Sequence, residues 1–166
     1  MYKINDFIMY NTTGVCKITD IRQGKLFNDI ETRYYVLHPV FENNTSAIMI
    51  STDNTRVKMR RIISKNDVLA LIDAFPTIDT GWISDNKLRC AKHKEYLLSG
   101  SCEEWVKLFK TLKLKKREKE ELNKTLSPTD EATMKYAEKL LYQEFSVALN
   151  IPVNAVGNYI MQRASL

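Results

Sequence analysis

Short apolar runs separated by turn residues fill the first 60 positions of the chain. Runs of this length, with Asn, Thr and Gly at the breaks, are typical of β-strands joined by tight turns. We expect strands at residues 6–10, 15–21, 32–38 and 47–51, with a break at Gln23-Gly24. Turns spaced roughly ten residues apart are typical of a small barrel of Tudor or SH3 size.

The period of the apolar positions changes after Arg61. From there they recur every three or four residues, which predicts α-helices. Ser64, Ser101 and Ser127 each precede such a stretch and can cap a helix by accepting a hydrogen bond from a first-turn amide. The helices are expected to begin at Ser64, Trp82, Ser101, Ser127 and after Pro152.

These two patterns predict an α+β protein of two domains. Residues 1–60 form a small Tudor/SH3-like β-barrel module, and residues 61–166 form an all-α helical module. A chain of 166 residues is long enough for both, since domains usually run from about 50 to 200 residues.

Charge is distributed unevenly along the chain. The formal net charge is +5, and most of the excess lies in residues 61–126, which also hold both tryptophans, Trp82 and Trp105. A basic, Trp-bearing segment favours a polyanionic partner such as nucleic acid. The alternative is that these lysines only solvate the outer faces of helices.

Other features of the composition narrow the class of protein. No apolar run approaches the ~18–20 residues of a membrane helix, so we expect no membrane contact. The N-terminal residues lack a long apolar core followed by a cleavage site, which argues against secretion. Three cysteines are an odd number without close spacing, as expected for reduced thiols in a cytoplasmic protein.

The sequence offers little support for catalysis. Its two histidines are His38 and His93, and Cys90 with His93 could supply only two metal ligands. Cys102 follows a predicted N-cap, where its pKa could be lowered, but its place in the apolar period favours packing in the core. No glycine-rich phosphate loop is present. We therefore expect no enzyme activity, no metal and no cofactor.

Trp82 is the most informative single residue. Trp105 falls in register with its apolar neighbours and is expected in the core, whereas Trp82 follows a loop and begins a basic segment. One interpretation is that the Trp82 indole fastens the loop to the helices. The other is an exposed aromatic wedge flanked by cations, which could unstack a base step in the minor groove of DNA.

The order of these features resembles the CarD/CdnL family of bacterial RNA polymerase-binding transcription regulators. In the first module the similarity rests on residues 3–10 (KINDFIMY), Gly14-Val15, residues 33–37 (RYYVL) and residues 48–54 (IMISTDN). In the second module it rests on Trp82, residues 97–100 (LLSG), and Leu126-Ser127 ahead of residues 132–134 (ATM).

The resemblance implies a function. The N-terminal domain would dock on the β-subunit lobe of bacterial RNA polymerase through the strand at Ile48, Met49 and Ile50. The helical domain would touch promoter DNA, with Trp82 wedged into the minor groove at the upstream edge of the bubble to stabilise the open complex. The protein would act as a monomer in the cytoplasm, associated with the nucleoid through the polymerase. The DNA-binding residues are then Trp82, Lys87, Arg89, Lys92 and Lys94.

This sequence departs from the family at three of the relevant positions. An arginine of the polymerase-contacting strand is Met49 here, and two basic residues after the tryptophan are Ser84 and Asp85. These departures leave an alternative open. In it the protein is an adaptor that does not bind DNA, its β module binding a protein strand and its helices serving as a scaffold.

Overall fold

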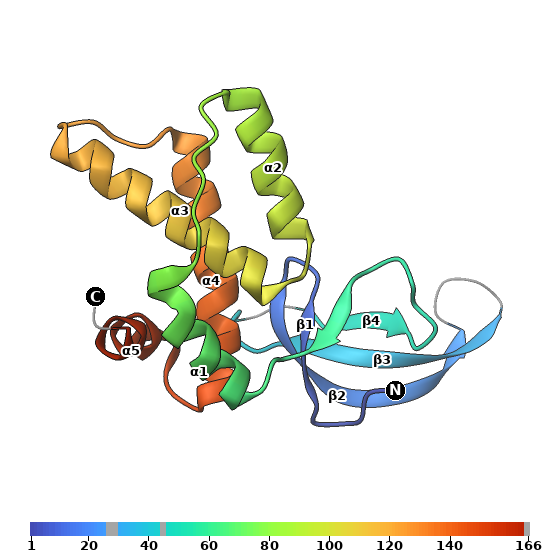
Figure 1. Cartoon of the computed structure of the whole chain (residues 1–166). Helices are drawn as coiled ribbons and strands as arrows, with labels where there is room; N and C mark the ends of the chain where they lie inside the picture. The colour runs from blue at the N-terminus through green and yellow to red at the C-terminus, as the bar shows by residue number, and fades with distance from the viewer. Residues whose placement is uncertain (26–29, 44–45, 165–166) are drawn as a thin grey trace. The chain divides into compact units, whose positions relative to one another are not determined.

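The chain divides into two compact units, Met1–Ile62 and Ile63–Leu166 (Figure 1). They are seen in a computed structural model, which describes residues 1–25, 30–43 and 46–164. The N-terminal unit is a sheet and the C-terminal unit is helical. The α+β architecture expected from the sequence is therefore confirmed, while a closed barrel of the Tudor type stays a prediction. The predicted domain boundary after residue 60 falls inside the last strand of the sheet.

The N-terminal sheet is antiparallel, and its strands lie in the order β4-β3-β2-β1-β5. The strands are β1 (Phe7–Tyr10), β2 (Gly14–Lys25), β3 (Glu31–Pro39), β4 (Ile48–Ser51) and β5 (Met59–Arg61). Gly14, with φ of 105°, closes the turn between β1 and β2 in a conformation that favours glycine. β4 and β5 therefore lie at the two edges of the sheet.

One strand prediction was wrong, and one strand was not predicted. β2 does not break at Gln23-Gly24, because it continues to Lys25 in cross-strand register with β3, where Gln23 pairs with Arg33. A register shift between Ile18 and Asp20 precedes this extension. β5 was not predicted at all, since three residues are too few to show a period; it forms by pairing with β1.

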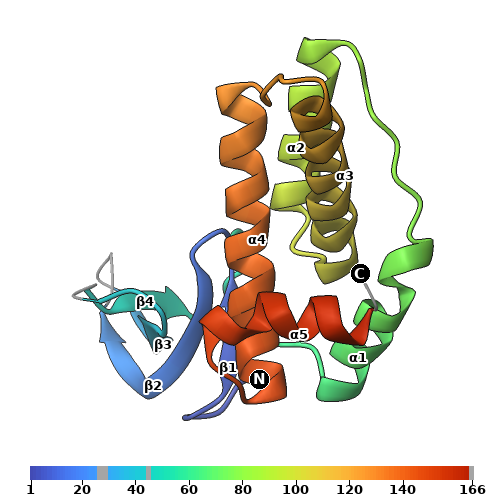
Figure 2. The same cartoon turned by 90° about the vertical axis from the view of Figure 1, so that its left-hand side faces the viewer.

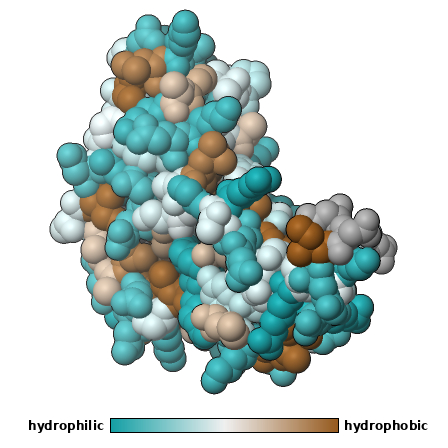
Figure 3. All heavy atoms as spheres, turned by 90° about the vertical axis from the view of Figure 1, so that its right-hand side faces the viewer, coloured by the Kyte–Doolittle hydropathy of each residue, from teal (hydrophilic) through white to brown (hydrophobic). Residues whose placement is uncertain are grey.

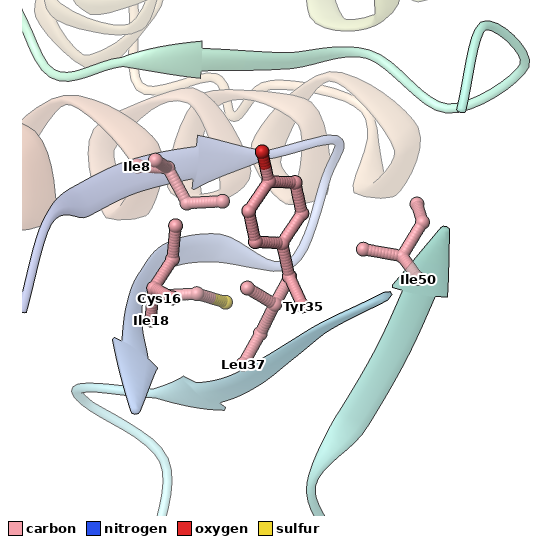
Figure 4. Packing of buried hydrophobic residues seen from close by; sticks show 6 residues of the cluster. All are labelled: Ile8, Cys16, Ile18, Tyr35, Leu37 and Ile50. Carbon is pink, nitrogen blue, oxygen red and sulfur yellow. The ribbon is translucent and has the colours of Figure 1, made fainter. Parts of the chain in front are cut away.

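One hydrophobic cluster forms the core of the sheet (Figure 4). Its side chains come from four strands and point toward one another: Ile8 of β1, Cys16 and Ile18 of β2, Tyr35 and Leu37 of β3, and Ile50 of β4. Tyr2 closes one side, its ring packing edge-on at 5.7 Å between centroids against Tyr35. The Tyr2 hydroxyl donates to the carbonyl of Met59 at 3.1 Å.

The helical unit contains α1 (Lys65–Ala74), α2 (Asn86–Leu98), α3 (Cys102–Glu121), α4 (Pro128–Leu149) and α5 (Val156–Arg163). The three predicted serine caps are confirmed: Ser64, Ser101 and Ser127 each accept a hydrogen bond from a first-turn amide. Ser64 also forms the complete capping box with Asp67. Trp105 is fully buried, as its register predicts.

The start of α2 differs from the prediction. Its N-cap is Asp85, whose side chain accepts from the amide of Leu88 at 2.7 Å, so the helix begins four residues after Trp82. Asp85 stands where the resemblance leads us to expect a basic residue. Its observed role is structural, as the N-cap of α2. Trp82 lies in the non-helical segment that precedes it.

The surface carries apolar side chains in small groups. Figure 3 shows one face on which hydrophilic residues predominate and hydrophobic ones are interspersed. Among the described residues, none of the helices has both the length and the apolar character needed to cross a bilayer.

Candidate functional site

β4 is an exposed edge whose residues alternate between core and solvent. Ile50 is buried in the hydrophobic cluster and Ile48 packs against it, so neither side chain is presented outward. Met49 lies between them with 44% of its surface exposed. Of the three residues expected to contact the polymerase, Met49 is thus the most exposed.

The backbone of Met49 also faces outward. The Thr52 amide donates to the carbonyl of Arg33 at 2.9 Å, which makes Arg33 and Thr52 a hydrogen-bonded pair of the antiparallel ladder. Pairs alternate along such a ladder, so Met49, which stands opposite Val36, is a non-hydrogen-bonded position. Its N–H and C=O point away from β3. No further strand lies beyond β4 in the described part of the sheet, so these groups can receive a strand from another chain.

Trp82 is half-buried and lies against two cations of the helical unit. The guanidinium carbon of Arg89 lies 4.4 Å from the centre of the indole, and Nζ of Lys115 lies 5.2 Å from it. Both distances are within the range of cation–π attraction. These contacts fasten the indole to α2 and α3, as the first interpretation of Trp82 expects. The ring is not completely buried and has cations beside it, as the wedge interpretation expects.

Arg89 connects the Trp82 segment to the helices. It donates to the carbonyls of Ile83 at 2.9 Å and Ser84 at 3.2 Å, the two residues that follow Trp82. It also makes a two-pronged ion pair with Asp130 of α4, at 3.2 Å through Nε and 3.0 Å through Nη2. Its side chain is buried, so the guanidinium is not presented to solvent, and the contact of Arg89 with DNA stays a prediction. Its bonds to protein acceptors position Trp82.

The charges in this buried cluster are set by their neighbours. Burial raises the pKa of Asp130, but hydrogen bonds from Arg89 and Ser127, together with the nearby positive charge, outweigh burial and leave the pKa below its usual value. Burial lowers the pKa of His93, against the opposite effect of the Asp130 carboxylate. His93 Nδ1 lies 3.7 Å from Asp130. Asp130 is thus ionised and His93 is neutral at neutral pH.

The other predicted DNA contacts are lysines of α2 in different settings. Lys87 and Lys94 are exposed and lie seven residues apart, two helical turns, so they share one face of α2. Lys92 is ion-paired with Glu95 at 2.9 Å, and this hydrogen bond raises the Lys92 pKa. Lys87 and Lys94 are therefore the cations of α2 best placed for phosphate.

Sequence reasoning missed Lys115 and Asp130. Both lie more than 30 residues from Trp82 in the chain, and only the packing of α2 against α3 and α4 brings Lys115 to the indole and Asp130 to Arg89. The sequence shows the charged run around Lys115, but it does not show which of these side chains faces Trp82.

The comparison with known families concerns the N-terminal unit. Residues 2–63 match the family model described as the CarD-like/TRCF RID domain. No curated protein matches the sequence. The match covers all five strands and the exposed edge at β4, and it ends where the helical unit begins. It confirms the resemblance to the CarD/CdnL family over this part of the chain, and residues 2–63 are similar to the CarD-like/TRCF RID domain.

Proposed function

We propose that the protein is a transcription regulator that binds bacterial RNA polymerase through β4 and stabilises the promoter open complex through Trp82. Polymerase binding through β4 is supported by the match of residues 2–63 to the RID-domain model. It is also supported by the edge strand β4, where both the backbone and the side chain of Met49 face away from the sheet core. In this proposal the sheet is of the Tudor type and its partner is the β-subunit lobe of the polymerase. The protein is a monomer in the cytoplasm and acts by binding, without catalysis.

Polymerase docking at β4 would take place by strand addition. With methionine in place of an arginine, the contact depends on main-chain hydrogen bonds at Met49 and on the apolar side chain, not on an ion pair. The neighbouring Ile48 and Ile50 keep the strand in register by packing their side chains into the core.

A proline at position 49 tests this docking directly. Proline is tolerated on an edge strand where the N–H faces away from the sheet, so Met49→Pro removes the outward donor while leaving the ladder to β3 intact. We expect Met49→Pro to weaken binding of the full chain to purified polymerase at least tenfold. Met49→Ala keeps the N–H and should lose less. Equal binding by Met49→Pro and wild type, with unchanged melting temperatures, would exclude strand addition at β4.

The DNA contact would combine Trp82 with nearby cations. A partly exposed indole beside Lys115, with Lys87 and Lys94 on the adjoining helix, provides a wedge and two phosphate contacts. A wedge that fits only distorted DNA binds the open complex better than the closed one, and so shifts that equilibrium without chemistry. Arg89 contributes by holding the segment that carries the indole.

Salt dependence distinguishes these cations from solvated surface lysines. In the double variant Lys87→Gln/Lys94→Gln, two lost phosphate contacts should reduce the slope of log affinity against log salt by about 2 for the polymerase–promoter complex. The control is Lys65→Gln, an exposed lysine on α1. An unchanged slope in the double variant would contradict a role for α2 in DNA binding.

The placement of Arg89 favours a second candidate function, an adaptor that does not bind DNA. With Arg89 buried and Lys92 paired with Glu95, fewer of the predicted cations are available to phosphate than the sequence indicates. Under this function β4 still binds a protein strand, while variants of Trp82 and of the α2 lysines leave every DNA-dependent effect unchanged.

A further inference from the structure

The helical unit contains a cavity that the proposed function does not use. It has a volume of about 660 Å³ and lies between α3, α5 and residues of α4. Figure 2 shows α5 running across the end of α4 toward α1, with α3 on the same side. The volume is that of pockets that hold one small organic molecule.

The floor of the cavity is apolar and aromatic. Phe109 of α3 and Tyr142 of α4 contribute rings that meet edge to face at 6.0 Å between centroids. Ile160 and Met161 of α5 and Leu114 of α3 extend this surface. Leu114 and Met161 are 46% and 48% exposed, so the apolar surface continues to the mouth of the cavity.

Two cations stand at the rim without acidic partners. Lys113 and Arg117 lie four residues apart on α3 and both line the cavity. Neither forms an ion pair with any of the described residues; Lys113 Nζ lies 5.7 Å from the centre of the Phe109 ring. Like charges at this spacing repel each other on a helix. An anion between them would remove the repulsion.

A third cation is buried in the wall. The side chain of Lys110 is nine-tenths buried, and its Nζ donates to the carbonyls of Pro76 at 3.0 Å and Ile78 at 2.7 Å. These acceptors are neutral, and among the described residues no carboxylate pairs with this ammonium. An unneutralised buried charge is costly and adds positive potential to the cavity. Glu120 is the acid among the lining residues, and the neighbouring Lys116 is already paired with Glu131 at 3.0 Å.

We propose that this cavity binds an amphiphilic organic anion, with its alkyl or aromatic body on Phe109 and Tyr142 and its acidic head group between Lys113 and Arg117. The charge of the rim selects against cations, and the apolar floor selects against small inorganic anions. The residues that line the cavity include neither Trp82 nor any residue of β4, so the inference does not depend on the proposed function.

The test uses the full chain and two probes. Anilinonaphthalene sulfonate, an aromatic anion, should bind with a saturable rise in fluorescence at one equivalent, and octanoate should displace it while octylammonium does not. The double variant Lys113→Gln/Arg117→Gln should weaken the binding of both anions roughly three- to tenfold, as expected for the loss of two exposed charge contacts. Leu114→Glu, at an exposed rim position, should weaken them further.

The control variant is Lys65→Gln/Lys124→Gln, which removes the same charge from exposed positions outside the cavity and should leave the affinity for both anions unchanged. Equal affinity of wild type and the Lys113/Arg117 variant overturns the proposal, as does equal displacement by octylammonium and octanoate. Displacement of the probe by an acidic amphipathic peptide but not by octanoate also overturns it, in favour of a protein partner.

Discussion

The buried ion pair between Arg89 and Asp130 should make the helical unit unusually sensitive to one substitution. Asp130→Asn keeps the size of the side chain but removes its charge, leaving the Arg89 guanidinium buried without a counter-ion. The Arg89 and Asp130 side chains are 8% and 2% exposed, so water cannot replace the lost partner. The amide keeps only one acceptor oxygen, so it cannot accept all the hydrogen bonds from Arg89 and from the Ser127 hydroxyl, which lies 2.8 Å from the carboxylate.

The expected magnitude follows from this burial. Removing one member of a buried ion pair costs about 3–5 kcal/mol, since the other charge stays uncompensated. At a urea dependence of about 1.5 kcal/mol per molar, a loss of 3 kcal/mol lowers the unfolding midpoint by about 2 M. The loss of helical circular dichroism measures this transition.

An exposed pair in the same unit provides a matched control. Arg163 makes two hydrogen bonds of 2.7 Å to Asp73, a geometry like that of the buried pair, but these side chains are 37% and 53% exposed. Asp73→Asn should therefore cost only about 0.2–1 kcal/mol. If Asp130→Asn shifts the midpoint no more than Asp73→Asn, the stabilising role assigned to the buried cluster is wrong.

Three further predictions concern titration and packing. Because the Asp130 pKa is lowered in the folded state, the stability that its charge contributes is present above the ordinary carboxyl pKa of about 4 and is lost as pH falls through the folded value. Wild type and Asp130→Asn should thus converge in stability below about pH 4; a constant difference down to about pH 2 would contradict this. Burial raises the Cys16 pKa to about 12, so this thiol should react with a maleimide at pH 8 far more slowly than half-buried Cys90 until urea unfolds the sheet; equal native rates would contradict it. Leu37→Ala, in the centre of the sheet cluster, should cost about 2–5 kcal/mol in urea unfolding, and a cost below about 1 kcal/mol would mean that the cluster is not the core of this unit.

Local chemistry explains which parts of the fold could be predicted from the sequence. Ser64, Ser101 and Ser127 were identifiable as caps because a cap is decided by residues within one helical turn. Trp105 was identifiable as core because its neighbours repeat at the helical period. The start of α2 differs from the prediction because Asp85, four residues after Gly81, caps the helix, and the apolar period alone does not locate this cap.

Distant contacts explain what could not be predicted. β5 exists only through its pairing with β1, and Met59–Arg61 carries no period of its own. Arg89 looked like a surface cation because its partner, Asp130, is 41 residues away. The cavity beside α3 could not be predicted either. Its lining residues come mostly from α3, α4 and α5, and only the packing of these helices brings them together.

The lifetime of the promoter open complex tests the central claim most directly. Bacterial RNA polymerase would be bound to a promoter, challenged with a competitor, and the decay of open complexes followed with wild-type protein, with Trp82→Ala and with no addition. We predict that wild type lengthens the half-life, and that Trp82→Ala loses most of this effect while still binding polymerase. A tenfold difference corresponds to about 1.4 kcal/mol of open-complex stabilisation. Equal half-lives with wild type and Trp82→Ala would contradict the wedge.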